Sequence, residues 1–300
     1  MVRRRKGEPI HGWVLLDKPL GLTSTQALGK VRHYLQAQKA GHGGTLDPLA
    51  SGVLPIALGE ATKLIPFVMD GQKEYHFTIR WGEARDTGDA EGVVTATSPV
   101  RPDLAALRAV LPRFIGQINQ VPPAFSALKI NGERAYDLAR AGLEPEMIAR
   151  PVQIHDLQVL SRIDADHAAL TVLCGKGTYV RSLARDIALA LGTVGHVAAL
   201  QRVRVGPFRL EGTISLEKLE DLAHKDGALT ALHPMTLALD DIPARIVDAQ
   251  DAHRLRRGQT ILALPHEQRS PTMLALENGQ PVAIIAYQTG TWQPVRGFNL

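Results

Sequence analysis

Cysteine is almost absent from this sequence: the 300 residues include one, Cys174. A single cysteine excludes a disulfide framework within the chain and a zinc site made of several cysteines. The eleven histidines are scattered, and no pair has the His-Glu-x-x-His spacing that is typical of catalytic zinc. The sequence therefore predicts a protein without a bound metal, suited to a reducing compartment.

Long hydrophobic runs are also missing. No stretch approaches the roughly 18 consecutive apolar residues of a membrane span. The basic residues 3–6 are not followed by an apolar segment of signal-peptide length. We therefore expect a cytoplasmic protein without a membrane partner, and a disordered basic N-terminus over residues 1–10.

The charge balance is mildly basic, with 34 Lys and Arg against 30 Asp and Glu and a net charge of +4. Such a balance favours a polyanionic partner, of which nucleic acid is one. The side chains that could contact phosphate are Lys73, Lys129, Lys176, Arg202, Arg204 and the arginines of residues 254–257. A solvated surface position explains any one of them better, so they support nucleic acid only as a group.

Strand-like and helix-like patterns alternate along the chain. Residues 75–81 alternate apolar and polar side chains, as a half-buried strand does. Residues 180–191 carry a strong apolar stripe with helical spacing. The sequence therefore predicts a fold that mixes helices and strands, in about two domains.

Two changes in pattern divide the chain. Residues 121–151 are rich in proline and basic side chains, and they indicate an excursion from the core sheet with a short helix near residues 133–141. After residues 241–244 the helical periodicity ends, and Asn278-Gly279 between two apolar runs predicts a β-hairpin. We therefore expect a first domain over residues 11–243 and a small β-rich domain over residues 244–300.

The most unusual stretch, residues 41–48, reads Gly-His-Gly-Gly-Thr-Leu-Asp-Pro. Its three glycines allow tight turns with positive φ, and they place one carboxylate, Asp47, on a shaped loop. A carboxylate can be a nucleophile, a general base or a structural cap. A phosphate cradle fits poorly, because the acid would repel phosphate and no phosphate-binding motif is present. An ordinary surface turn remains the alternative.

Two further side chains could act with Asp47. Tyr75 begins the apolar face of its strand, so it either packs in the core or points its hydroxyl into a cleft. Arg181 follows two glycines and Thr178, a plausible N-cap, and lies about 100° from the centre of the apolar stripe. It is either a solvated arginine or the bidentate partner of a buried carboxylate.

Residues 41–54, continuing to 59–63, closely resemble motif II of the TruB family of pseudouridine synthases. Further segments that resemble this family occur in the expected order, at residues 17–24, 73–75, 86–92, 122–129, 174–186, 200–202 and 206–208. The resemblance covers residues 11–240, and it is closer to bacterial members than to relatives that work with guide RNAs. The final portion, with residues 255–259, is similar to a PUA-type RNA-binding domain.

The resemblance implies an α/β (α+β) fold with a mixed, largely antiparallel sheet flanked by helices, and a small C-terminal PUA-like domain. It implies isomerisation of uridine to pseudouridine at position 55 in the T loop of tRNA, without a cofactor. The enzyme is expected to be a monomer that recognises the T arm and needs no protein partner. Residues 121–151 would form an RNA-gripping thumb.

The resemblance also assigns roles to individual residues. Asp47 would be the nucleophile, attacking C6 or C1′ or acting through a glycal-type intermediate, Arg181 its partner, and Tyr75 the side chain stacked on the target base. His42 would fill the space left by flipped nucleotides. The other residues expected to bind substrate are Gly43, Tyr179, Lys18, Lys129 and Leu200. A non-catalytic RNA-binding protein on the same scaffold is the alternative, which the combination of Asp47, Tyr75 and Arg181 disfavours.

Overall fold

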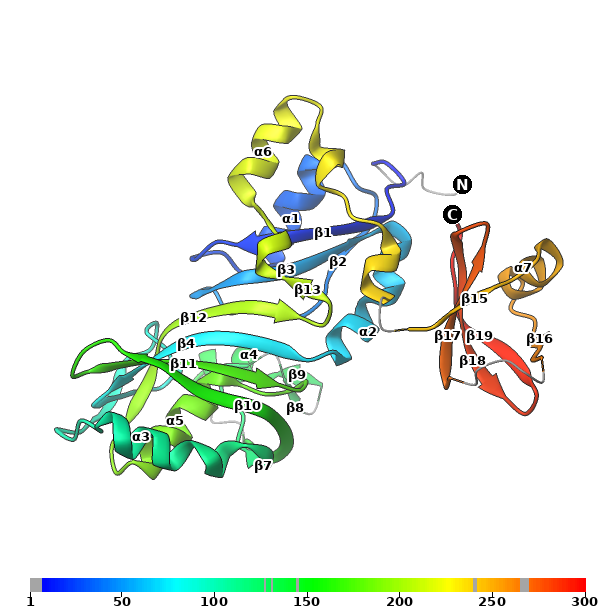
Figure 1. Ribbon diagram of the computed structural model, residues 1–300. Helices are drawn as coiled ribbons and strands as arrows, with labels where there is room; N and C mark the ends of the chain where they lie inside the picture. Colours follow the sequence, from blue (N-terminus) through cyan, green and yellow to red (C-terminus); the bar gives the residue numbers. More distant parts are fainter. Residues whose placement is uncertain (1–6, 127, 131, 144–145, 240–241, 265–269) are drawn as a thin grey trace.

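The computed structural model describes residues 7–126, 128–130, 132–143, 146–239, 242–264 and 270–300. Figure 1 shows a large body, coloured blue to yellow, and a smaller orange and red body that the chain enters last. Within the described residues, no helix is both long and apolar enough to cross a membrane. Of the N-terminal segment expected to be disordered, residues 7–10 are described, and Glu8 donates from its backbone to Gln36 O at 2.7 Å.

The large body is organised around a ten-stranded sheet. Its strands are β1 (Gly12–Lys18), β2 (Ala40–His42), β3 (Ala50–Leu58), β4 (Lys73–Trp81), β7 (Gly116–Gln120), β10 (Arg150–Arg162), β11 (His167–Cys174), β12 (Gly195–Val205), β13 (Phe208–Arg209) and β14 (Ile214–Ser215). The main path runs β14-β1-β3-β12-β4-β11-β10-β7, and β2 and β13 pair with β3 and β12. The pairs β1–β14 and β3–β12 are parallel and the others antiparallel. The predicted mixed, largely antiparallel sheet is confirmed.

Helices pack near both edges of this sheet (Figure 1). The α-helices of the large body are α1 (Ser24–Tyr34), α2 (Ile65–Asp70), α3 (Leu104–Val110), α4 (Ala135–Arg140), α5 (Val180–Ala190) and α6 (Leu216–His224). The 3-10 helices are η1 (Gly59–Leu64), η2 (Leu111–Phe114), η3 (Leu210–Gly212), η4 (Ala228–Ala231) and η5 (Met235–Leu239). Helices α1 and α6 lie near β1 and pack with β1 and β3 in one apolar cluster. Helices α3 and α5 lie near β10 and β11 and pack with β4, β10 and β11 in another.

Helix α5 begins one residue later than the sequence suggests. The predicted cap, Thr178, donates its hydroxyl to Gly175 O at 3.2 Å, and Tyr179 is the N-cap. The backbone N–H of Tyr179 donates to Gln120 Oε1 at 2.8 Å, so a side chain from β7 supplies the missing acceptor. This start places Arg181 in the first turn of the helix, where it faces the loop before β3.

Two small hairpins project from the large sheet. One joins β5 (Glu83–Arg85) and β6 (Val94–Thr97), and the other joins β8 (Lys129–Ile130) and β9 (Glu133–Arg134). The second hairpin and α4 lie within the predicted excursion, and α4 matches the short helix expected there.

The small body is a five-stranded sheet with one helix. Its elements are β15 (Ala244–Ile246), α7 (Ala249–Arg256), β16 (Ile261–Leu262), β17 (Thr272–Glu277), β18 (Gln280–Gln288) and β19 (Thr291–Gly297), and the strand order is β15-β17-β18-β19-β16. The predicted hairpin is confirmed: Asn278 and Gly279 have φ of 50° and 78°, as a tight two-residue turn needs. Helix α7 was not predicted, because only Ala252 and Leu255 of its eight residues are buried.

The small sheet docks on the large one through polar and apolar contacts. Lys63 Nζ donates to Gly297 O at 2.7 Å, and Glu60 Oε2 accepts from the backbone N–H of Asn299 at 2.8 Å. Between these contacts Phe298 is 1% exposed and belongs to the same apolar cluster as Trp13 of β1. The two sheets therefore share a core.

Candidate active site

The glycine-rich loop between β2 and β3 is held at nearly every residue. Gly43 donates its backbone N–H to Pro55 O at 2.7 Å. The buried Ser24 hydroxyl donates to Leu46 O at 3.0 Å and accepts from Leu46 N at 2.8 Å. Ala50 N donates to Asp47 O at 3.0 Å and closes the turn. A loop with its backbone fixed in this way presents the Asp47 side chain at a defined place.

The three glycines of this loop serve different purposes. Gly44 has a φ of 120°, as the sequence suggests for the whole group. Gly41 and Gly43 do not have positive φ; a Cβ at these positions would lie 2.7 Å from Ile65 Cδ1 and 2.9 Å from Val68 Cγ1. A side chain at either of these two positions would therefore meet a side chain of α2.

Lys18 also holds the same loop, through hydrogen bonds from its side-chain ammonium to backbone carbonyls. Its Nζ donates to Pro19 O at 2.9 Å, to Leu22 O at 2.7 Å and to Pro48 O at 3.4 Å, and the residue is 0% exposed. Burial lowers the pKa of Lys18 to about 8, although Asp47 opposes this change. Backbone carbonyls thus occupy the Lys18 donors away from solvent, and the expected substrate contact by Lys18 stays a prediction.

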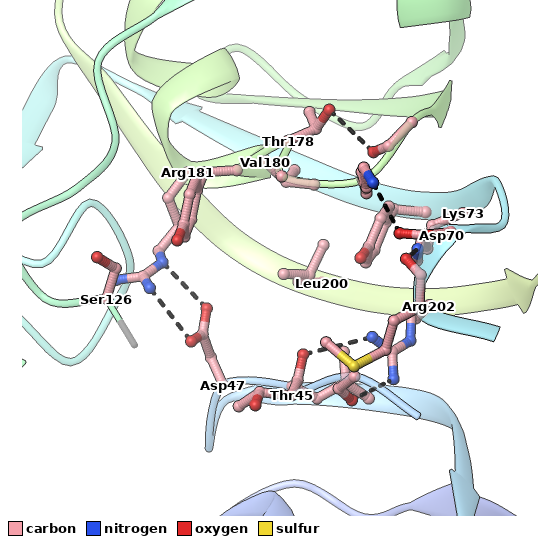
Figure 2. A pocket seen from close by; sticks show the side chains of 18 residues that line it. Thr45, Asp47, Asp70, Lys73, Ser126, Thr178, Val180, Arg181, Leu200 and Arg202 are labelled. Atoms are coloured by element: carbon pink, nitrogen blue, oxygen red, sulfur yellow. Dashed lines mark hydrogen bonds and ion pairs between the residues drawn. The ribbon is translucent and has the colours of Figure 1, made fainter. Parts of the chain in front are cut away.

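Asp47 and Arg181 form a bidentate ion pair (Figure 2). Arg181 Nε lies 3.0 Å from Asp47 Oδ2, and Nη2 donates to Oδ1 at 3.2 Å. The Arg181 side chain is 6% exposed and that of Asp47 is 35% exposed. The solvated alternative for Arg181 is therefore excluded, and the carboxylate is the more accessible member of the pair.

The rest of the Arg181 guanidinium is also occupied. Nη1 donates to Thr87 O at 2.7 Å, and Nη2 donates to Phe125 O at 2.8 Å. Asp89 Oδ2 lies 3.7 Å from Nη1, and Asp89 accepts from the Thr87 hydroxyl at 2.6 Å. Two separate loops, one with Thr87 and Asp89 and the other with Phe125, thus fix the fork that holds Asp47.

The surroundings act on the Asp47 carboxyl in opposite directions. Burial raises the pKa of Asp47 above its usual range, and the nearby Asp89 adds to the rise. Arg181 and Lys18 counteract it, since positive charge favours the ionised form. The bidentate geometry is one that only an ionised carboxylate fully uses.

Two cavities meet at this ion pair. One, of about 340 Å³, is bounded by β4, β12 and the segment before α5; the other, of about 670 Å³, is bounded by the start of α1 and by the loops carrying Asp89 and Phe125. Asp47, Arg181 and Ser126 line both. Both volumes fall in the range of ligand sites, about 300–1,000 Å³.

Besides Asp47 and Arg181, three more of the predicted site residues line the smaller cavity. Tyr75, Tyr179 and Leu200 all line it, with Leu200 at the centre of the view in Figure 2. Burial raises the pKa of the Tyr75 hydroxyl, so the phenol stays protonated at neutral pH. Tyr75 both packs in the core and reaches the cavity, which combines the two interpretations of its strand.

His42 lines the larger cavity. Burial lowers the pKa of His42, and Arg202 contributes to the change. His42 Nδ1 and Ser126 Oγ are buried and have no hydrogen-bond partner among the described residues. Both residues line this cavity. Lys129 begins β8, but its side chain lies outside the described part of the chain.

Sequence reasoning missed the role of Arg202, which it treated only as one possible phosphate contact. Arg202 is 1% exposed and donates to three backbone carbonyls around the loop. Two of these carbonyls, of Gly44 and Thr45, belong to the glycine-rich loop, and the third, of Val53, belongs to β3. The signal in the sequence was that residues 200–202 resemble a segment of the family. In the described residues, no group of three or more His, Cys, Asp or Glu side chains could hold a metal ion.

Comparison with family models gives two adjoining matches. The model of the TruB family pseudouridylate synthase N-terminal domain matches residues 32–180. The model of the tRNA pseudouridylate synthase B C-terminal domain matches residues 181–242. Asp47 of the ion pair lies in the first match, and Arg181 is the first residue of the second.

Whole-chain relatives agree with these matches. The tRNA pseudouridine synthase B of Caulobacter vibrioides is 52% identical, with 100% of both chains covered. That of Bradyrhizobium diazoefficiens is 53% identical over 99% of this chain and 88% of its own.

Solved structures agree with the fold. A Cbf5–Nop10–Gar1 complex contains a chain with a TM-score of 0.72 and 27% identity, covering 92% of this chain and 78% of its own. An H/ACA RNP bound to a substrate RNA containing 2′-deoxyuridine gives a TM-score of 0.74 at 24% identity, covering 100% of this chain and 92% of its own.

Fold, site and comparisons together define a pseudouridine synthase, an isomerase that converts a uridine to its C-glycoside isomer. Within that class the chain belongs to the TruB family. The resemblance of residues 11–240 is thereby confirmed, and so is an enzyme in place of a non-catalytic binding protein.

Proposed function

We propose that this enzyme isomerises uridine to pseudouridine in tRNA, at position 55 of the T loop, with Asp47 as the nucleophile. The observation that carries the proposal is the Asp47–Arg181 pair between two cavities. Relatives that match the full chain at about half identity are tRNA pseudouridine synthases B. The substrate class and the reacting group are thus supported by independent observations.

The reaction exchanges one bond for another without a net redox change. The N1–C1′ bond of uridine breaks and a C5–C1′ bond forms, while C5 loses a proton and N1 gains one. An ionised Asp47 can attack C6 of the ring or C1′ of the ribose, or serve a glycal-type intermediate, and each route requires a carboxylate with a free oxygen lone pair. The 35% exposure of Asp47 leaves room for that approach.

Access to Asp47 requires the base to leave the RNA stack. Tyr75 and Leu200 offer the flipped uracil an aromatic and an aliphatic wall in the smaller cavity. His42 lies at the larger cavity, where a planar side chain can fill the space that flipped nucleotides vacate. Gly43 and Tyr179 complete the proposed contacts through backbone and ring.

RNA outside the site would meet two further parts of the chain. We assign residues 121–151, including Lys129, as a thumb that grips the T arm, and residues 244–300 as a PUA-type RNA-binding domain. Residues 11–243 form the catalytic domain in this division. The enzyme would act as a monomer in the cytoplasm, without a protein partner.

The test is tritium release from unmodified tRNA that carries C5-tritiated uridine, followed by mapping of the modified position. Asp47→Asn is expected to lower the single-turnover rate by more than about 1,000-fold, while the Kd for tRNA stays within about threefold of that of the parent enzyme. Asp221→Asn, an exposed change on α6, is the matched control. Turnover by Asp47→Asn, or modification at another position, would refute the corresponding part of the proposal.

A further inference from the structure

Arg202 lies at the centre of the large sheet. It belongs to β12, which pairs with β3 on one side and β4 on the other, and its Cα partners are Gly52 and Tyr75. A Cβ at Gly52 would lie 2.2 Å from Arg202 O, so glycine allows the two strands to approach here. Arg202 is 1% exposed, so its side chain is withdrawn from bulk solvent.

The guanidinium binds two segments at once. Nε donates to Val53 O of β3 at 2.9 Å, whereas Nη2 donates to Gly44 O at 3.0 Å and Nη1 to Thr45 O at 3.3 Å. Figure 2 shows the Arg202 side chain reaching the loop that carries Asp47, with dashed lines to that loop. The planar group can satisfy three carbonyls in fixed directions, which an ammonium on a flexible stem cannot reproduce.

Tyr75 is the second neighbour of Arg202. The two residues face each other across the antiparallel pair β4–β12, so their side chains share one face of the sheet. Both line the smaller cavity, together with Leu200 two residues earlier on β12. The positive charge of Arg202 opposes the rise that burial produces in the pKa of Tyr75.

We propose that Arg202 is a positioning residue for the isomerisation, which fixes the Asp47 loop and the Tyr75 ring relative to each other. The inference rests on the proposed roles of Asp47 and Tyr75. Arg181 approaches Asp47 from α5, and Arg202 determines where the loop itself lies against β4 and β12. Loss of the fork would let the loop move against the flipped base, and misplacement by about 1 Å can lower a rate about 100-fold.

The variants that test this role are Arg202→Lys, which keeps the charge, and Arg202→Gln, which removes it. Both are expected to lower the single-turnover rate of tritium release by about 100-fold. Affinity for tRNA is expected to stay within about threefold, because Arg202 contacts only protein. The matched control is Arg80→Lys on β4, a sheet arginine that pairs with Glu83 outside the site.

A double-mutant cycle separates positioning from a general loss of stability. Positioning predicts that Arg202→Lys costs less in a Tyr75→Phe background than in the parent enzyme, because the two side chains act together. Additive effects, or a rate within threefold of the parent enzyme, would overturn the inference; so would a rate loss matched by an equal loss of tRNA affinity. If Arg202→Gln does not fold, Arg202→Lys carries the same comparison.

Failure of this inference is distinguishable from failure of the proposed function. An inactive Asp47→Asn beside a fully active Arg202→Lys would remove only the role of Arg202. An active Asp47→Asn would remove the proposed nucleophile, whatever the Arg202 variants do.

Discussion

The Arg181 guanidinium and the Asp47 carboxylate meet side-on across 134 residues of sequence, with N–O distances of 3.0 and 3.2 Å. The arginine is almost completely buried, and the aspartate reaches two cavities. Burying a charge is costly unless a partner and further hydrogen bonds compensate. The carbonyls of Thr87 and Phe125 supply those bonds, so the arginine is held before substrate arrives.

Replacement of this arginine by lysine is expected to impair catalysis although the charge remains. In the parent enzyme the guanidinium donates to Asp47, Thr87 and Phe125 at the same time. Arg181→Lys replaces it by a single ammonium, which cannot reach all three acceptors. Loss of one or two charge-assisted hydrogen bonds corresponds to a rate lower by about 10- to 200-fold. Single-turnover tritium release measures the effect.

Arg108→Lys, on the exposed face of α3, is the control for that experiment and is expected to leave the rate unchanged. A parent-like rate for Arg181→Lys would mean that charge alone, without the fork, supports Asp47.

A second prediction concerns Gly52, which has a φ of 101° and lies against β12. Gly52→Ala would place a Cβ 2.2 Å from Arg202 O, a backbone atom that cannot rotate away. We expect a loss of about 2–4 kcal/mol in the free energy of unfolding, measured by urea titration. Gly29→Ala in α1 is the matched control, since a Cβ there meets nothing within 4 Å; it should stabilise by about 0.5–1 kcal/mol. Equal effects of the two changes would contradict the strand-approach argument.

A third prediction uses the buried Lys18, whose pKa is lowered from 10.5 to about 8. Between these values the folded protein binds fewer protons at Lys18 than the unfolded chain does, so stability rises with pH. Relative to Lys18→Met, the free energy of unfolding of the parent enzyme should therefore increase by about 3 kcal/mol from pH 8 to pH 10.5. Urea unfolding of both proteins across this range gives the difference.

Taking the difference between the two proteins removes the contribution of other titrating groups, including the buried Lys73. A constant difference across the range would show that Lys18 keeps an ordinary pKa, and that its three carbonyl contacts do not isolate it from water.

Local sequence determined much of the architecture. Alternation predicted β4 and helical spacing predicted α5. A strand and a helix each bury one face, so their apolar residues recur with a characteristic period. Asn278-Gly279 predicted its hairpin, since few other pairs adopt two successive positive φ values. The loop carrying Asp47 was recognisable from its own residues and from the family motif.

Other features depended on residues far apart in the chain. Spacing left Arg181 at the edge of a helix face, and only the packing of α5 against the loops of Thr87 and Phe125 decided that it is buried. The N-cap moved from Thr178 to Tyr179 because Gln120, from β7, supplies the acceptor. Helix α7 buries too few residues for its apolar side chains to show a helical period in the sequence.

The sequence by itself determined the family, the sheet class and the carboxylate on its glycine-rich loop, because these are recorded in contiguous residues. The tertiary structure decided which cations hold the loop that carries this carboxylate. The sequence suggested a substrate contact for Lys18 and a phosphate contact for Arg202, yet both are buried against backbone carbonyls. A carbonyl acceptor has no identity in the sequence, since every residue carries one, and so only the fold reveals which of them a buried cation will meet.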